Sequence, residues 1–377
     1  MKSYRKEFPV TEKYIYLDHA GVAPVSNRVK NAVGRFLKES SEEGAFKYPS
    51  WQELTDRARV SAGKLIHAQK NDIAFIRSTS HGLSLAAEGF PWKNDDNVLV
   101  YEGEFPSNLY PWMHLKRKGV DVRYIPSRDG KIGIAEIENA MDRKTRMLSI
   151  SSVQFSTGFS IDLKAVGNVC RKKGVVFCVD AIQSLGVVPT DVNEYEIDFL
   201  AADAHKWMIG PEGIGFLYCR KELAELLEPV LVGWKSVVQE FAFEEPSFLL
   251  KKNAQKFEEG SMNMMGIIGM GAAIDLLREV GVAKIEERVK DLGDHIIQRA
   301  NERRYSVVTP EARKERAGIV TIRGPFDPSR VRDRLGEKNI MVNVRADGIR
   351  VSPHFYNLEE EIDEVFLQMD RAIKSGE

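Results

Sequence analysis

The sequence predicts an α/β fold, with a mainly parallel sheet that helices cover on both faces and a smaller α+β domain behind it. Three observations predict this fold. From about residue 73 to 219, short apolar or β-branched runs alternate with helical patterns, as in a parallel sheet with helical crossovers. Beyond residue 256 the pattern changes to long helices with short strands between them. At 377 residues the chain is also longer than one hydrophobic core usually serves.

Seven runs in the first part are predicted to be the strands of one sheet. They lie at residues 73–76, 98–101, 120–125, 147–151, 175–180, 199–202 and 215–218. The segment between the last two runs is too short for a helical crossover, so we expect one strand of the sheet to run antiparallel. These runs and the helices between them place a large domain at residues 16–255.

The smaller domain is expected at residues 256–377, and the amino-terminal segment 1–15 is expected to lean against it. Its predicted elements are a Gly-rich helix, a charged amphipathic helix, two short strands and a final acidic helix. They lie at residues 264–280, 282–303, 318–323, 349–352 and from 358 onward. We see neither an internal repeat nor a low-complexity linker.

Charge and hydropathy indicate a cytoplasmic protein. The 54 basic and 55 acidic residues give a formal net charge of -1, which offers no electrostatic footprint for nucleic acid or an anionic membrane. The charged amino terminus has no apolar stretch behind it, so no signal peptide is expected. The most apolar segment, residues 262–277, is too short to span a bilayer.

The three cysteines, Cys170, Cys178 and Cys219, form neither an even set nor a metal-binding spacing. Cys178 and Cys219 stand in apolar runs that are predicted to be strands, so buried structural thiols are expected. No metal site is predicted.

The sharpest chemical signal is an aspartate and a lysine at the ends of neighbouring strands. Asp180 ends a predicted strand in the segment VDAIQ, and Lys206 follows 26 positions later in the segment AHKW. Parallel strands place their ligands at their carboxyl ends, so both side chains can reach one crevice. Pyridoxal-5′-phosphate (PLP) chemistry needs this pair, because a lysine forms an imine with the aldehyde and a carboxylate keeps the pyridine nitrogen protonated. Either residue alone is more often a helix cap or a surface charge.

Three further segments carry groups that such a cofactor and its substrate need. The segment RSTSHG (77–82) opens a predicted helix, where hydroxyls and free N–H groups can bind a phosphate, although simple N-capping is the alternative. Phe105 follows a strand and can lie over a flat ring or in the core. Arg350, in the segment GIRVSPHFYN, can hold a carboxylate through two hydrogen bonds or form a surface salt bridge.

Together these segments resemble the class V aminotransferase family of fold-type-I PLP enzymes, which includes cysteine desulfurases, kynureninases and isopenicillin-N-epimerase-like proteins. The resemblance begins at YLDHAGVAP (16–24) and covers nearly the whole chain. It implies the fold-type-I architecture, with a mainly parallel seven-stranded sheet between helices. It also implies PLP as the cofactor and an amino acid as the substrate.

The resemblance further implies a role for each candidate residue. Lys206 would form the Schiff base with PLP and shuttle the α-proton, and Asp180 would pair with the pyridinium nitrogen. Gln183 would donate to the phenolic oxygen of the ring, and Phe105 would stack on it. The phosphate would contact Thr79, Ser80 and His205.

Two more roles follow from the same resemblance. Arg350 would bind the substrate carboxylate. Ser261, in the segment EGSMN (259–263), would reach the phosphate in the neighbouring subunit through its hydroxyl. A homodimer with shared active sites is therefore expected.

The chain departs from the family pattern at three points. The family often has Ser or Thr three residues before the lysine as a phosphate ligand, whereas this chain has Asp203, whose charge would repel phosphate. Gln154 stands where desulfurases carry an Asn near the ring, and it is a possible ring contact. Desulfurases also present a flexible cysteine just before the position of Arg350, and none of the three cysteines lies there. A persulfide mechanism is therefore not expected.

The sequence favours an aminotransferase, because transamination needs only the cofactor-binding and substrate-binding residues that the family shares. The alternatives are a PLP-dependent β-lyase or cysteine desulfurase-like enzyme that cleaves a C–S bond, and an epimerase. A non-catalytic PLP-binding protein is a further alternative, against which the set of Lys206, Asp180 and Arg350 argues. The residue pattern leaves the amino acid, the acceptor and the pathway open.

Overall fold

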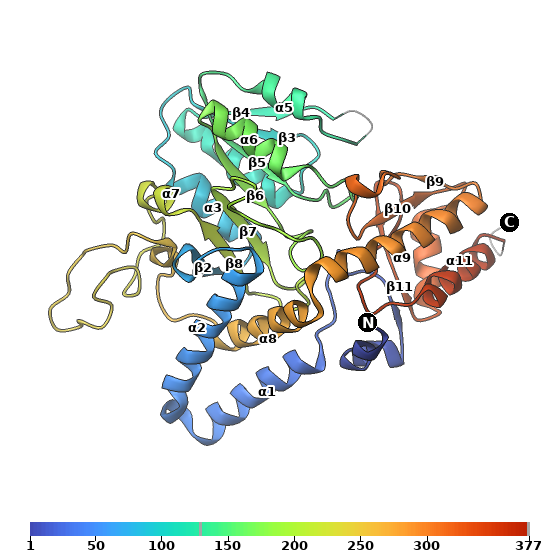
Figure 1. The fold of residues 1–377 in the computed structure, drawn as a ribbon, viewed down its shortest axis with the longest axis horizontal. Coiled ribbons are helices and arrows are strands. Elements are labelled where there is room, and N and C mark those ends of the chain that lie inside the picture. Colours follow the sequence, from blue (N-terminus) through green and yellow to red (C-terminus); the bar gives the residue numbers. More distant parts are fainter. Residues whose placement is uncertain (128–129, 375–377) are drawn as a thin grey trace.

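A seven-stranded sheet forms the centre of the larger lobe in the computed structural model, which describes residues 1–127 and 130–374 (Figure 1). Its strands are β2 (Ile73–Ile76), β3 (Asn97–Tyr101), β4 (Asp121–Ile125), β5 (Thr145–Ser151), β6 (Val176–Asp180), β7 (Phe199–Asp203) and β8 (Gly215–Cys219). The strand order is β2-β8-β7-β6-β5-β3-β4. Strands β7 to β4 are mutually parallel, and β8 is antiparallel to both of its neighbours. The predicted sheet and its single antiparallel strand are confirmed.

Helices cover both faces of this sheet, so its inner strands are buried on both sides. Alternate residues of one strand serve two separate hydrophobic cores: Phe199 and Ala201 of β7 point into one, and Leu200 and Ala202 into the other. The helices of the larger lobe are α1 (Asn27–Glu42), α2 (Tyr48–Leu65), α3 (Thr79–Gly89), α4 (Tyr110–Met113), α5 (Ile134–Ala140), α6 (Leu163–Lys173), α7 (Lys221–Leu226) and α8 (Met264–Val280). Helix α8 packs against α1 and α2.

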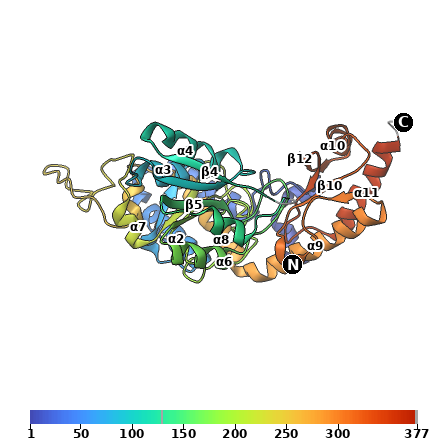
Figure 2. The same cartoon turned by 90° about the horizontal axis from the view of Figure 1, so that it is seen from above.

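The smaller lobe has a four-stranded antiparallel sheet in the order β12-β13-β10-β9. Its strands are β9 (Ser306–Val307), β10 (Val320–Arg323), β12 (Asn343–Arg345) and β13 (Gly348–Val351), and its helices are α9 (Val282–Glu302), α10 (Pro328–Gly336) and α11 (Glu359–Lys374). Helix α9 runs from the larger lobe into the smaller one, and the view from above places the two lobes side by side (Figure 2). The division of the chain at residue 256 stays a prediction.

The amino-terminal segment lies against the smaller lobe. It contains the short 3-10 helices η1 (Lys2–Glu7) and η2 (Pro9–Glu12), and then strand β1 (Ile15–Tyr16), which pairs in parallel with β11 (Ile340–Met341). The ring of Phe8 stacks on Tyr356 with the ring centres 3.7 Å apart. The other 3-10 helices are η3 (Gly44–Lys47), η4 (Lys70–Asp72), η5 (Pro106–Asn108), η6 (His114–Lys118), η7 (Ala254–Phe257) and η8 (Arg313–Glu315).

A long segment between α7 and η7 projects away from the larger lobe (Figures 1 and 2). It exposes Phe241, Phe243 and Phe248 to solvent. Among the helices that the structure describes, none has the length and apolar character needed to cross a membrane.

Candidate active site

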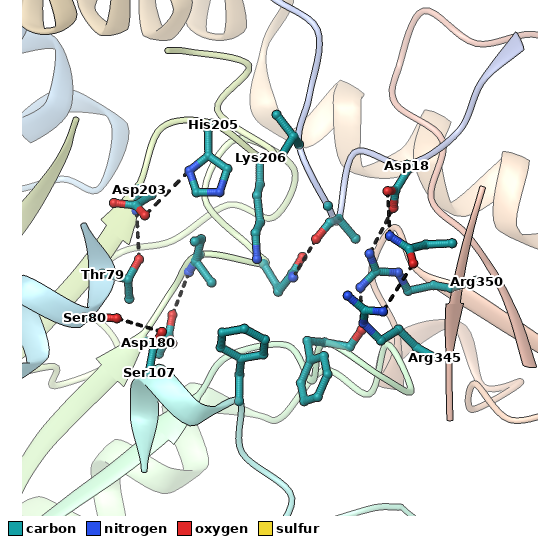
Figure 3. A pocket seen from close by; sticks show the side chains of 18 of the residues that line it. Asp18, Thr79, Ser80, Ser107, Asp180, Asp203, His205, Lys206, Arg345 and Arg350 are labelled. Atoms are coloured by element: carbon teal, nitrogen blue, oxygen red, sulfur yellow. Dashed lines mark hydrogen bonds and ion pairs between the residues drawn. The ribbon is translucent and has the colours of Figure 1, made fainter. Parts of the chain in front are cut away.

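A cavity of about 490 Å³ lies where the two lobes meet (Figure 3). The larger lobe contributes residues that follow the carboxyl ends of its strands, and the smaller lobe contributes residues of β11, β12 and β13. Eight of the residues that the sequence predicts for the site line this one cavity: Thr79, Ser80, Phe105, Asp180, Gln183, His205, Lys206 and Arg350. The carboxyl edge of the sheet therefore collects residues from segments far apart in the chain.

Lys206 stands just beyond β7 and extends into the cavity (Figure 3). Burial, with a contribution from Arg350, lowers the pKa of its amine to about 8, although Asp180 and Asp203 act in the opposite direction. A far larger fraction of this amine than of an ordinary lysine is therefore uncharged and nucleophilic near neutral pH, although the charged form still predominates. Its Nζ atom lies 5.6 Å from the centre of the Phe105 ring.

Asp180 ends β6 and is only 2% exposed. Its Oδ1 accepts a hydrogen bond of 3.0 Å from the backbone N–H of Ile182. Burial raises the pKa of this carboxyl group to about 6, while that hydrogen bond and the nearby Lys206 act in the opposite direction. Asp180 is therefore an anion at neutral pH, as a partner for a protonated ring nitrogen must be.

The amide of Gln183 is held in one orientation by two hydrogen bonds. Its Oε1 accepts from the indole N–H of Trp207 at 2.7 Å, and its Nε2 donates to the carbonyl oxygen of Ala20 at 3.1 Å. Because the indole can only donate, the oxygen of the amide must face Trp207. The amide nitrogen keeps its second N–H for an acceptor in the cavity, which suits the phenolic oxygen of PLP.

Hydroxyl groups meet at the start of α3. Ser78 caps this helix through its side chain, and the first N–H groups of an α-helix have no partner inside the helix. The hydroxyl of Ser80 donates to that of Ser107 at 2.8 Å, and Thr79 Oγ1 accepts from the backbone N–H of Asp203 at 3.0 Å. This end of the cavity has the donors and the helix dipole that a phosphate group requires.

His205 lies beside this group with its Nδ1 buried and without a hydrogen-bond partner among the described residues. Burial and the charge of Lys206 lower the pKa of its ring, so the neutral form dominates near pH 7. A phosphate bound at this end of the cavity would give the buried, unpartnered nitrogen of His205 a hydrogen-bond partner. The residues present therefore fit PLP.

Arg350 forms an ion pair, the alternative role that the sequence left open, but the pair is buried and does not lie on the surface. Its side chain is almost fully buried, with Nη2 donating to Asp18 Oδ1 at 2.9 Å and Nη1 to the carbonyl oxygen of Phe155 at 3.0 Å. Asp18 also accepts from Asn343 Nδ2 at 2.8 Å. The Nε of Arg350 has no partner in the part of the chain that the structure describes.

Arg345 is a second arginine in the same wall (Figure 3). Its Nη1 donates to neutral oxygens only, to Val344 O at 2.7 Å and to Asn343 Oδ1 at 3.2 Å. No carboxylate oxygen of residues 1–127 or 130–374 forms an ion pair with it. The pairing of β12 with β13 brings Arg345 to the cavity, since Asn343 lies opposite Arg350 in this hairpin.

Phe105 is 38% exposed and packs edge-on against Phe155, with the ring centres 5.2 Å apart. Both rings line the cavity. Gln154, a possible ring contact from the sequence, is buried and donates to Glu104 Oε1 at 3.1 Å. It does not line the cavity, because the next residue, Phe155, takes that place in the wall.

The three cysteines are buried and free, as the sequence predicted, and none of them lines the cavity. Cys178 lies within β6, and burial raises the pKa of its thiol to about 12. Burial raises the pKa of Cys170 and Cys219 as well. All three are therefore protonated and poorly nucleophilic at neutral pH.

Ser261 is exposed and lies outside the main cavity. It lines a second, smaller cavity together with Arg77 and His81. Its predicted role in a neighbouring subunit stays a prediction. Sequence reasoning left out Asp18, Ser107, Asn343 and Arg345 from the site; Asp18 stood in the quoted YLDHAGVAP element, and the other three carried no separate signal.

Comparison with known proteins gives one family. The sequence model of the class-V aminotransferase family matches residues 15–365. A probable cysteine desulfurase of Methanothermobacter thermautotrophicus is 29% identical, over 95% of this chain and 94% of its own length. The uncharacterized aminotransferase YcbU of Bacillus subtilis is also 29% identical, over 97% of both chains.

Solved structures share the fold. An apo structure of cysteine desulfurase from Thermococcus onnurineus NA1 superposes with a TM-score of 0.90 and 25% identity, covering 99% of this chain and 98% of that one. The cystine C–S lyase C-DES, in complex with its product cysteine persulfide, gives a TM-score of 0.89 at 22% identity, over 96% and 98% of the two chains. This chain therefore belongs to the class-V aminotransferase family and is a PLP-dependent enzyme with the fold-type-I architecture.

Proposed function

We propose that this protein is an aminotransferase that moves the amino group of an α-amino acid to a 2-oxo acid. The observation that carries the proposal is the content of the main cavity, where Lys206 and Asp180 lie opposite two arginines and all three cysteines lie elsewhere. Transamination requires a lysine that carries protons and a site for the substrate carboxylate. It requires no thiol, unlike a desulfurase that takes sulfur onto its own cysteine.

The same residues that line the cavity would hold the cofactor. Thr79, Ser80 and His205, with the first N–H groups of α3, would bind the phosphate. Gln183 would donate to the phenolic oxygen, and Phe105 would contact the face of the ring. Bound PLP supplies an electron sink for the negative charge that develops on the substrate's α-carbon.

Two side chains would hold or transfer protons in the proposed reaction. Asp180, an anion at neutral pH, would hold the proton on the ring nitrogen. Lys206 Nζ would accept the proton that leaves the α-carbon and return it later in the cycle. Its pKa of about 8 lies closer to neutral pH than that of an ordinary lysine, and a general base is most effective when its pKa is near the pH of the reaction.

Asp18, Arg345 and Arg350 line one wall of the cavity, which we call the arginine wall. Their charges match a single carboxylate. Asp18 offsets the charge of Arg350 through their 2.9 Å ion pair. Arg345 forms no ion pair within residues 1–127 and 130–374, so Asp18, Arg345 and Arg350 together carry one net positive charge. The α-carboxylate of an amino acid supplies one negative charge, and charge-assisted hydrogen bonds from a planar guanidinium fit its two oxygens.

Replacing Arg345 with glutamine is expected to raise the KM for the amino-acid substrate by about 10- to 100-fold, because a hydrogen bond to a charged group contributes about 1.5–3 kcal/mol. PLP binding should not change. Steady-state kinetics and a cofactor titration of the same preparation measure both quantities. Arg334→Gln on α10, which removes an exposed arginine, is the matched control. An unchanged KM in Arg345→Gln would remove Arg345 from the substrate site.

A second candidate is a PLP-dependent lyase that cleaves a C–S bond. The names of the relatives favour it, since several are probable cysteine desulfurases and one structural neighbour is a cystine C–S lyase. In such a lyase the sulfur leaves with the product, so no thiol of this chain is needed. The buried cysteines argue against a persulfide on the enzyme itself.

One experiment separates the two candidates. The purified enzyme with PLP is titrated with a panel of L-amino acids while its visible spectrum is followed and the products are analysed. Conversion of the cofactor to its amine form, with one equivalent of 2-oxo acid released, supports the aminotransferase. Pyruvate and sulfide from cysteine-like substrates, with the cofactor spectrum restored, would replace it with the lyase.

We also infer a homodimer in which Ser261 contributes to the partner's site. Two features support it: Ser261 is exposed beside Arg77, near the start of α3, and the projecting segment exposes three phenylalanines that association would cover. Light scattering should then give twice the chain mass of 42.6 kDa, and a monomer would contradict the inference. The near-neutral charge favours an enzyme that binds neither nucleic acid nor anionic membranes, and we propose a cytoplasmic location for it.

A further inference from the structure

Asp203 is an acidic side chain at the phosphate end of the proposed cofactor site. It ends β7, lines the main cavity and is 9% exposed (Figure 3). Its Oδ1 is buried and has no hydrogen-bond partner among the described residues. Its Oδ2 lies 3.6 Å from His205 Nδ1, which is longer than a hydrogen bond. The carboxyl group is thus close to the phosphate donors and is not satisfied by them.

The surroundings of Asp203 do not suit a carboxylate anion. Asp180 and Glu212 are like charges that disfavour ionisation, and the neutral ring of His205 supplies no cation. Lys206 and the backbone N–H of Thr79 favour ionisation of Asp203, and attachment of the cofactor would occupy the amine of Lys206. A buried carboxylate oxygen without a donor is costly, and a phosphate group nearby would add strong repulsion. A neutral carboxylic acid avoids both costs, since its O–H is a hydrogen-bond donor.

We propose that Asp203 binds the phosphate of PLP as a neutral carboxylic acid, donating a hydrogen bond to a phosphate oxygen, so that the site takes up a proton when the cofactor binds. This inference rests on the proposed cofactor site around Lys206. It explains how an aspartate can stand where related enzymes often have the hydroxyl of Ser or Thr.

The charge state of Asp203 makes cofactor affinity depend on pH. Burial, reinforced by Asp180, raises the pKa of Asp203 to about 7 in the protein without PLP. A bound phosphate raises the pKa further, because a neighbouring like charge disfavours the ionised form. Affinity is therefore full below about pH 7 and falls as the pH rises towards the higher pKa of the complex. One proton taken up per cofactor corresponds to about a tenfold loss of affinity per pH unit in that range.

The test compares the wild-type enzyme with Asp203→Asn and Asp203→Ser, both of which keep a neutral donor at this position. The dissociation constant of PLP is measured by equilibrium dialysis between pH 6 and 9 at constant ionic strength. The phosphate of PLP and Lys206 also titrate, so the informative quantity is the ratio of wild-type to variant dissociation constants. We expect this ratio to rise by about tenfold per pH unit above pH 7.

Infrared difference spectroscopy gives a second readout that does not depend on activity. Adding PLP to the wild-type protein should increase the C=O band of a protonated carboxyl group, and Asp203→Asn should lack this increase. Both variants should fold, because the carboxyl group of Asp203 forms no hydrogen bond to another side chain of the described residues, and its backbone N–H keeps Thr79 Oγ1 as a partner. Circular dichroism checks this.

A ratio that stays constant with pH, together with no carboxyl band, would mean that Asp203 is ionised in the complex and would overturn the proposal. If the wild-type protein binds PLP at Lys206 but the ratio of dissociation constants does not change with pH, only the Asp203 proposal fails and the proposed function remains. Wild-type protein that binds no PLP at any pH would instead contradict the cofactor site itself, and the Asp203 proposal with it.

Discussion

Lys206→Ala is expected to abolish the covalent attachment of PLP and to lower turnover by on the order of 10²- to 10⁴-fold. Lys206 is the lysine that lines the main cavity, and its pKa of about 8 supplies the uncharged amine that attachment requires. The variant loses both the attachment point and the proton carrier. Borohydride reduction followed by peptide mass spectrometry measures the first loss, and steady-state kinetics with the best donor amino acid measures the second.

Lys30→Ala is the control for this experiment, because Lys30 is an exposed residue of α1 that does not line the cavity. It should keep both the reducible linkage and the activity. If borohydride still fixed the cofactor to another lysine in Lys206→Ala, the assignment of the central residue would be wrong. Retained PLP without a covalent link would support the assignment, since the phosphate and ring contacts remain.

Arg350→Ala is expected to lower the free energy of unfolding by about 3–5 kcal/mol and to weaken amino-acid binding while PLP stays bound. The stability loss follows from the ion pair with Asp18, because removing one partner leaves the other charge buried and uncompensated. The pair joins strand β13 to the segment after β1, so its loss also loosens the wall of the cavity. Urea unfolding with and without PLP measures the first effect, and substrate titration the second.

A double-mutant cycle isolates the contribution of the pair. Asp18→Asn alone removes the opposite charge, and the double variant Asp18→Asn/Arg350→Ala removes both. We expect the double variant to be less destabilised than the sum of the two single variants, with a coupling of at least about 0.5 kcal/mol. Additive losses would mean that the 2.9 Å contact contributes little. Loss of PLP from folded Arg350→Ala would point to a structural role of Arg350 in the cofactor site.

The seven strands of the large sheet were predictable because each one is a local feature. Runs such as residues 199–202 and 215–218 are continuous apolar stretches, which mark strands buried on both faces. The short connection between them forces an antiparallel return, and the structure has that arrangement. The order of the predicted strands and helices along the chain was therefore enough to predict the fold class.

The lysine and the aspartate of the site were predictable for a related reason. Asp180 and Lys206 follow the ends of neighbouring parallel strands, and the topology alone brings such positions to one edge. The family resemblance added Thr79 and Phe105 to this group, and both line the same cavity in the structure. No knowledge of packing was needed for that step.

The arginine wall was decided by tertiary structure. Asp18 and Arg350 are 332 positions apart, and neither the spacing nor the residue types along the chain signals their pairing. Arg345 reaches the cavity only because β12 folds back on β13. Gln154 illustrates the converse, since it stands at a plausible position in the sequence yet points to Glu104 instead of the cavity.

The sequence by itself determined the fold class through the order of strands, and the family through its motifs. It also placed Asp180 and Lys206 at one edge of the sheet, because both follow strand ends. The tertiary structure decided which charges meet and how they are screened. It paired Arg350 with Asp18, gave Arg345 no counter-ion within residues 1–127 and 130–374, and buried Asp203 beside the proposed phosphate site. Burial and long-range contacts set these charge states, and both exist only once distant segments have packed together.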